Sequence, residues 1–142
     1  MRRAGGWVAA GVTAVIGLGV LAVLLWPDGY AVNRAIVAVY VVFQRLGVPG
    51  SVTPEVYAAV LNVLAFVPLG WLGVVALRRR PSAVFAALVL MSVGVEAVQA
   101  LPGLARDPSV VDVVLNGLGA ALGVGLGTLV RSRRSSGDDD PA

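Results

Sequence analysis

The segment VVDVVLNGLGAALGVGLGTLV, residues 110–130, decides the fold of this chain. Its length matches the roughly 20 apolar residues that a helix needs to cross the hydrocarbon core of a bilayer. Small residues four positions apart let two membrane helices approach closely, so we expect a glycine ridge here that packs on another helix. One helical face carries this ridge together with two polar residues: Asp112, Asn116, Gly119, Gly123 and Gly127.

Three more segments have the same apolar character, at 7–26, 56–77 and 82–101. Of the 142 residues 58% are hydrophobic and 13% charged, whereas a soluble domain carries about 25% charged residues. We therefore expect an all-α integral membrane protein: a bundle of four transmembrane helices within residues 1–130, then a disordered cytoplasmic tail over 131–142. The first span exceeds a signal-peptide core and lacks an A-x-A cleavage site, so we expect it to be an anchor.

The arginines are distributed unevenly among the loops. Four spans would place one group on a single side of the membrane: Arg2, Arg3, Arg78, Arg79, Arg80, Arg131, Arg133 and Arg134. The other side would carry Arg34, Arg45 and Arg106. The positive-inside rule then predicts that both termini are cytoplasmic. Lysine is absent while alanine, valine and glycine are abundant, which is typical of a high-GC bacterial genome, and we expect a bacterial plasma membrane.

The segment between the first two spans, NRAIVAVYVVFQR at 33–45, is too short to cross the membrane. If it is helical, its polar residues share one face, with the apolar residues largely opposite. That pattern favours a helix that lies on the outer membrane interface. A re-entrant or packed segment is the alternative.

Several kinds of chemistry are excluded by composition. The chain has no cysteine and no histidine, so it offers neither a thiolate metal site nor a histidine-based catalytic triad. We expect no metal and no cofactor. The arginines beside the membrane segments account for the basic character of the chain, so no nucleic-acid partner is expected.

Polar residues from three spans fall in one layer near the outer ends of those spans. Ser92, Glu96 and Gln99 follow the i, i+4, i+7 spacing of one helical stripe on the third span. Asn62 lies on the second span and Asn116 on the fourth. At 1.5 Å per residue, Glu96 and the two asparagines lie about 7–9 Å deep. We expect these side chains to face the interior of the bundle or a water-filled cavity.

Charge in such a layer needs a partner, because a charged residue at the centre of a membrane helix costs about 2.5–3.5 kcal/mol on insertion scales. Arg106 is one candidate partner for Glu96 and Asp112. The other candidate is a hydrogen bond from a protonated Glu96 to Asn62 or Asn116. The predicted binding or functional cluster is Asn62, Ser92, Glu96, Gln99, Arg106, Asp112 and Asn116.

Three blocks, in this order, resemble the VanZ-like family of small bacterial membrane proteins: LNVLAFVPLGWL at 61–72, SVGVEAVQ at 92–99 and RDPSVVDVVLNGLGAALG at 106–123. The resemblance implies a link to glycopeptide resistance of the teicoplanin type. Many members carry two adjacent acids where this chain has Val111 and Asp112. A role that needs both carboxylates, such as metal binding, is therefore not expected.

Three functions are compatible with these residues. The first is a non-enzymatic cell-envelope protein whose outward-facing polar pocket binds membrane lipid, a lipid-linked cell-wall precursor or a lipoglycopeptide. The second is an enzyme that uses Glu96 or Asp112 as acid or base on an envelope lipid, with Ser92 or Ser109 taking part. The third, an ion-coupled transporter, is disfavoured because four spans with few acids make a poor pathway. Catalytic residues, ligand and oligomeric state stay open.

Overall fold

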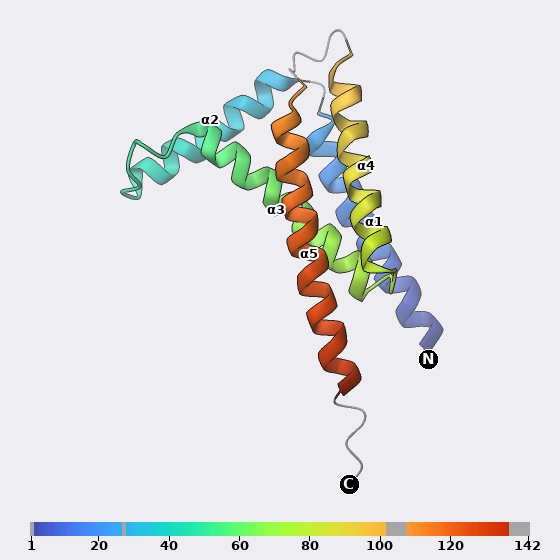
Figure 1. The fold of residues 1–142 in the computed structure, drawn as a ribbon. Coiled ribbons are helices and arrows are strands. Elements are labelled where there is room, and N and C mark those ends of the chain that lie inside the picture. Colours follow the sequence, from blue (N-terminus) through green and yellow to red (C-terminus); the bar gives the residue numbers. More distant parts are fainter. Residues whose placement is uncertain (1, 27, 102–107, 137–142) are drawn as a thin grey trace.

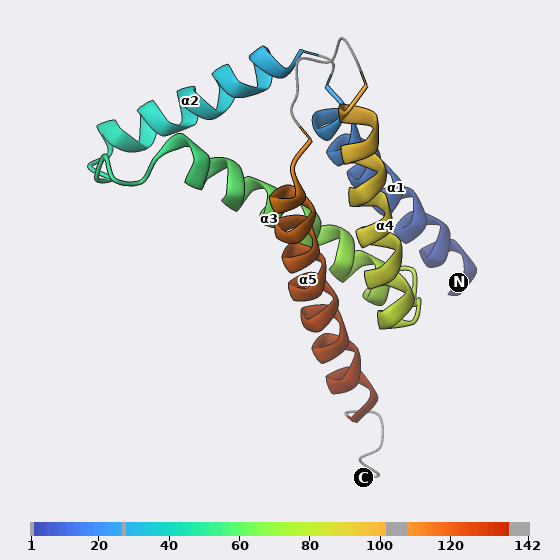
Figure 2. The same cartoon turned by 45° about the horizontal axis from the view of Figure 1, so that its top comes forward.

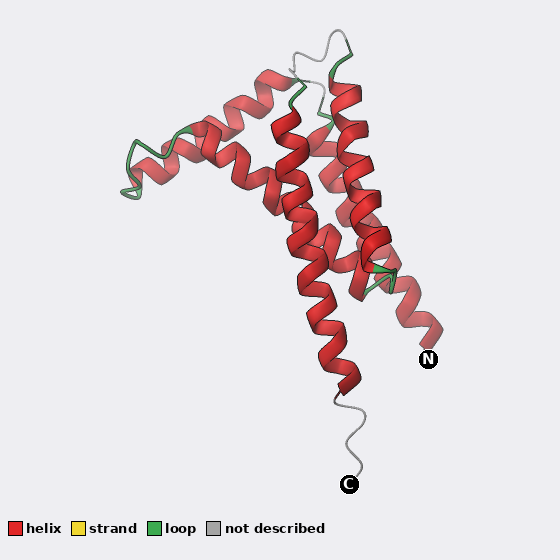
Figure 3. Ribbon diagram, viewed as in Figure 1, coloured by secondary structure: helices red, strands yellow, loops and turns green. Residues whose placement is uncertain are grey.

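The computed structural model describes residues 2–26, 28–101 and 108–136, and every regular element in these ranges is a helix (Figure 3). The all-α class is thereby confirmed for this part of the chain. The helices, labelled in Figure 1, are α1 (Arg2–Leu24), α2 (Gly29–Arg45), α3 (Pro54–Val75), α4 (Pro81–Gln99) and α5 (Val110–Ser136).

Three helices are long and apolar enough to cross a membrane by themselves: α3, α4 and the Val110–Arg133 part of α5. Gly11–Leu24 and Gly29–Arg45 meet the same test only as a pair, bent by 102° at the break between them. By length and composition the described residues therefore supply three spans, or four if the bent pair counts as one. The separate first span and the interfacial position of α2 stay predictions.

Local sequence explains where several helices begin and end. Proline occupies the first turn of both α3 and α4, where its missing N–H costs no hydrogen bond. Asp28 caps α2 by accepting a 2.9 Å hydrogen bond from the N–H of Ala31. At its C-terminal end α5 continues to Ser136, so residues 131–136 are helical where the sequence predicted a disordered tail. Residues 137–142 lie outside the described part.

The main packing contact joins α3 and α5 through backbone atoms. Gly119 and Gly123 lie against the carbonyl oxygens of Val63 and Val67, which leave no space for a Cβ atom at either glycine. A Cβ at Gly70 of α3 would in turn lie 2.7 Å from the carbonyl oxygen of Ala120. Because the partners follow one another in the same order, α3 and α5 run in the same direction.

The other helices pack around this pair. α4 lies against the C-terminal end of α3, where Gly73 faces Val84. α2 meets the start of α3 through Tyr57, whose ring centroid is 6.1 Å from that of Tyr40 and 5.4 Å from that of Phe43. α2 and α3 converge at their connecting loop and spread apart towards α1 and α5 (Figure 2). The two helices and α1 thus outline a wedge.

Gly123→Ala should destabilise the protein by about 1–3 kcal/mol, because the added methyl group forces apart two backbones that cannot yield locally. Gly125→Ala is the matched control, since a Cβ at Gly125 has no neighbour within 4 Å. The control should be neutral or slightly stabilising, as alanine favours a helix. Thermal unfolding of both variants in the same detergent checks this, and equal melting temperatures would contradict the ridge.

Candidate functional site

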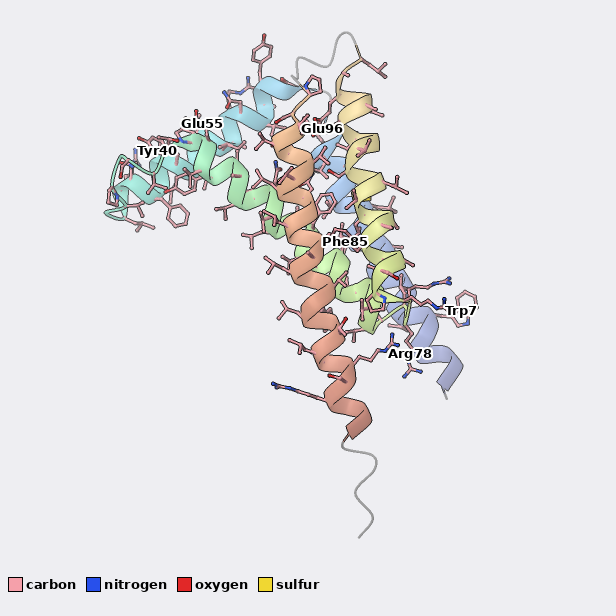
Figure 4. The ribbon with its side chains drawn as sticks, in the orientation of Figure 1. Trp7, Tyr40, Glu55, Arg78, Phe85 and Glu96 are labelled. Atoms are coloured by element: carbon pink, nitrogen blue, oxygen red, sulfur yellow. The ribbon has the colours of Figure 1, made fainter. Side chains whose placement is uncertain are left out.

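The polar stripe of α4 is buried at the end of the bundle where α4 ends and α5 begins. Ser92 is 0%, Glu96 9% and Gln99 5% exposed. Figure 4 shows Glu96 between α4 and α5 near their upper ends. The stripe that the sequence predicted therefore faces other helices.

Each residue of this stripe forms a hydrogen bond with a different part of the bundle. The Asn116 side-chain amide donates to Ser92 Oγ over 2.9 Å, which links α4 to the second turn of α5. Glu96 Oε2 accepts from the backbone N–H of Ser109, immediately before α5, over 2.6 Å. Gln99 Nε2 donates to the carbonyl oxygen of Leu24, the last residue of α1, over 2.6 Å.

Two of these bonds satisfy helix ends. The first N–H groups and the last carbonyl groups of a helix have no partner within it, and such a group is costly where it is partly buried without a partner. Gln99 supplies the donor for the end of α1, and Glu96 supplies the acceptor for the start of α5. The end of α4 thus holds two other helix termini in place.

The partners of Glu96 differ from those considered in the sequence. Arg106 lies outside the described residues. Asn116 is engaged with Ser92, and neither Asn116 nor Asn62 is among the described partners of Glu96. Sequence reasoning did not foresee the backbone N–H of Ser109. The available signal was Ser109-x-x-Asp112 before an apolar run, the pattern of a helix start.

Asn116 is the most deeply buried polar residue of the site after Ser92, with 1% exposure. Its Oδ1 atom has no hydrogen-bond partner in the part of the chain that the structure describes. A buried amide oxygen without a donor is costly. This atom is therefore the place in the bundle interior where a further donor group would be favourable.

Asn62 and Asp112 are separate from these connections and line a partly open cavity of about 700 Å³. We call it the α1–α2–α3 groove. Its wall includes Val20 and Val23 of α1, Ala35 and Ile36 of α2, and Leu61 and Ala65 of α3, together with Asn62 and Asp112. The described part of the predicted cluster thus divides into residues that connect helices and two residues that line the groove.

The groove is lined mainly by apolar residues. Apart from Asn62 and Asp112, all of the described residues that line it are apolar. Its volume falls within the roughly 300–1,000 Å³ of small-molecule sites. In the described residues no group of three His, Cys, Asp or Glu side chains could hold a metal ion. An apolar wall with two polar groups suits a molecule that has a hydrocarbon part and a polar head.

A double-mutant cycle should detect the Ser92–Asn116 hydrogen bond. Ser92→Ala and Asn116→Ala should each destabilise the protein, with a coupling energy of about 0.6 kcal/mol and at most about 1.7 kcal/mol, the range for such bonds in membranes. Unfolding free energies in bilayers or micelles give this value.

The control cycle pairs Asn116→Ala with Ser82→Ala, since Ser82 is exposed at the opposite end of α4. Distant sites should add to within about 0.3–0.5 kcal/mol. Equal coupling in the two cycles would show that the bond contributes nothing specific.

Comparison with known proteins places this site in a family. The family model VanZ/LLP1 matches residues 26–131, a range that contains α2, α3, α4 and most of α5 and leaves α1 outside. It includes both polar groups of the groove and the whole stripe of α4. No curated protein and no solved structure matches the chain. Since the match covers well over half of the sequence, the protein is a multi-pass membrane protein that belongs to the VanZ/LLP1 family.

Proposed function

We propose that this protein is a non-enzymatic binding protein of the bacterial cell envelope, and that its α1–α2–α3 groove holds the acyl chain of an amphiphile. The amphiphile is an envelope lipid, a lipid-linked cell-wall precursor or a lipoglycopeptide. The observation that supports this is the groove itself, whose described lining residues are apolar except for Asn62 and Asp112.

The apolar wall and the two polar residues of the groove have different roles in binding, because the surrounding solvent is lipid. Lipid tails are as apolar as leucine, so a hydrocarbon chain gains little by moving from the bilayer into an apolar groove. The apolar wall therefore sets the shape of the ligand. Asn62 and Asp112 set the affinity, because a polar group without a partner in hydrocarbon costs several kcal/mol.

The orientation that goes with this function is four spans with both termini in the cytoplasm of a plasma-membrane protein. Eight arginines would then lie on the cytoplasmic side. α2 would lie on the outer interface, which agrees with its lack of buried residues and with its sharp angle to α1. The groove beneath α2 then opens in the outer half of the membrane, where envelope precursors and glycopeptides are found.

The enzyme alternative has no observation in its favour. Glu96 accepts a 2.6 Å hydrogen bond from a backbone N–H and is nearly buried. That geometry fixes a helix end and presents no proton to the groove. Asp112, on the groove wall, is then a binding group.

Cysteine labelling tests the orientation, because the chain has no cysteine of its own. Ser51→Cys, exposed in the α2–α3 loop, should react with a membrane-impermeant maleimide in intact cells. Ser82→Cys, exposed at the start of α4, should react only after permeabilisation. The reverse pattern would place the termini outside and refute this orientation.

Filling the groove tests the binding function. Ala35→Trp places an indole in the groove, whereas Ala38→Trp, on the same helix and also exposed, places one outside it. Lipids that co-purify in mild detergent are quantified by mass spectrometry. Ala35→Trp should lose most of the bound amphiphile and Ala38→Trp should keep it.

The same two variants test the link to resistance in a teicoplanin-sensitive bacterium, at matched membrane abundance. Protection by the wild type and by Ala38→Trp, but not by Ala35→Trp, would tie resistance to the groove. If both variants retain as much amphiphile as the wild type, the groove is not the binding site.

A further inference from the structure

Ser109 and the first turn of α5 have the sequence pattern of a capping box. One of the two hydrogen bonds of that motif is made instead by a residue of another helix. Ser109 precedes the helix, and its carbonyl oxygen accepts from the N–H groups of Asp112 and Val113. Its hydroxyl oxygen accepts from the N–H of Asp112 over 3.4 Å. In an ordinary capping box, the acid three residues after the cap folds back and accepts the N–H of the cap residue. Here that acid is Asp112.

In this structure the N–H of Ser109 donates to Glu96 of α4 over 2.6 Å. Glu96 therefore occupies the position that Asp112 would take within its own helix. Asp112 is left on the groove wall. Its carboxylate makes no ion pair within the described ranges.

We propose that Glu96 is a positioning residue: by holding the N–H of Ser109 it keeps the Asp112 carboxylate turned to the groove, where Asp112 binds the ammonium group of an amine-headed phospholipid. This inference rests on the proposed function, and it names the class of amphiphile. Phosphatidylethanolamine is the simplest lipid with that head.

The charge of the groove-lining residues determines which class of lipid head group the groove binds. Among the described residues that line the groove, Asp112 is the only one that carries a charge. The start of α5 stabilises negative charge at this position, because helix N-termini carry a partial positive charge. An ammonium group pairs with a carboxylate and relieves its cost in an apolar wall, whereas an anionic head such as that of phosphatidylglycerol would be repelled.

Asn62 supports the same assignment. It is half-buried on α3 and shares the groove with Asp112. Its amide can donate to a phosphate oxygen and accept from an ammonium group. A zwitterionic head therefore finds a partner for each of its charges, one on α5 and one on α3.

The test measures lipid selectivity in nanodiscs that contain equal amounts of phosphatidylethanolamine and phosphatidylglycerol. The lipid retained after extraction is identified by native mass spectrometry, and the part displaced by Ala35→Trp counts as groove-bound. The wild type should enrich phosphatidylethanolamine about tenfold, as one charge-assisted hydrogen bond implies. Asp112→Asn should lose that enrichment.

Glu96 is tested by a variant that abolishes its role and one that preserves it. Glu96→Met keeps the volume of the side chain but removes the acceptor, so Asp112 should fold back onto Ser109 and the enrichment should fall to that of Asp112→Asn. Glu96→Gln can still accept from Ser109 through its amide oxygen and should retain the enrichment. The double variant Glu96→Met/Asp112→Asn should be no less selective than Asp112→Asn alone.

Each result decides one part of the inference. The ammonium site would be overturned if the wild type and Asp112→Asn enriched phosphatidylethanolamine equally, or if the wild type preferred phosphatidylglycerol. In either case, displacement of lipid by Ala35→Trp would still support the groove as the binding site. Wild-type enrichment in Glu96→Met would overturn the positioning role. If Glu96→Met does not fold, the infrared band of the Asp112 carboxylate is measured instead, and the band is assigned by its loss in Asp112→Asn. Addition of phosphatidylethanolamine should shift this band in the wild type and in Glu96→Gln. Lipid binding that is indifferent to Ala35→Trp would refute the proposed function itself.

Discussion

The backbone contact between α3 and α5 is the constraint on which the other features depend. Gly119 and Gly123 admit the carbonyl oxygens of Val63 and Val67 where any side chain would keep the helices apart. In a membrane, where apolar surface gains little by contact, such close packing is a main source of attraction between helices. Because it engages the central and C-terminal parts of α3, the start of α3 is free to tilt away towards α2. The groove occupies the space that this tilt opens.

The polar residues of α4 show how costly helix ends are in such a bundle. A soluble protein can leave the last carbonyl of one helix and the first N–H of another to water. Here Gln99 donates a hydrogen bond to the carbonyl oxygen of Leu24, and Glu96 accepts one from the N–H of Ser109. A side chain that looks like a catalytic acid in the sequence is thereby used as a fixed acceptor. Asp112, by contrast, is among the residues that line the groove.

The helices were predictable from the sequence because length and hydropathy decide them. The stripe of α4 and the glycine ridge of α5 were also visible, since both depend only on helical spacing. The partners were not, because a backbone atom such as the carbonyl of Leu24 has no signature in the sequence. The groove depends on the tilt of α3, which spacing does not encode. The helical residues 131–136 show that a helix can continue past its apolar segment.

The order of the helices along the chain has a consequence for biosynthesis. α3 finds its main partner in α5, which is synthesised later, and α4 is made in between. At about 5–20 residues per second, α3 stays in the membrane for several seconds with its small-residue face open to lipid. During that interval Gly70 lacks its neighbours Ala120 and Val124 of α5. A nascent chain that stalls before α5 therefore leaves the small-residue face of α3 without its packing partner.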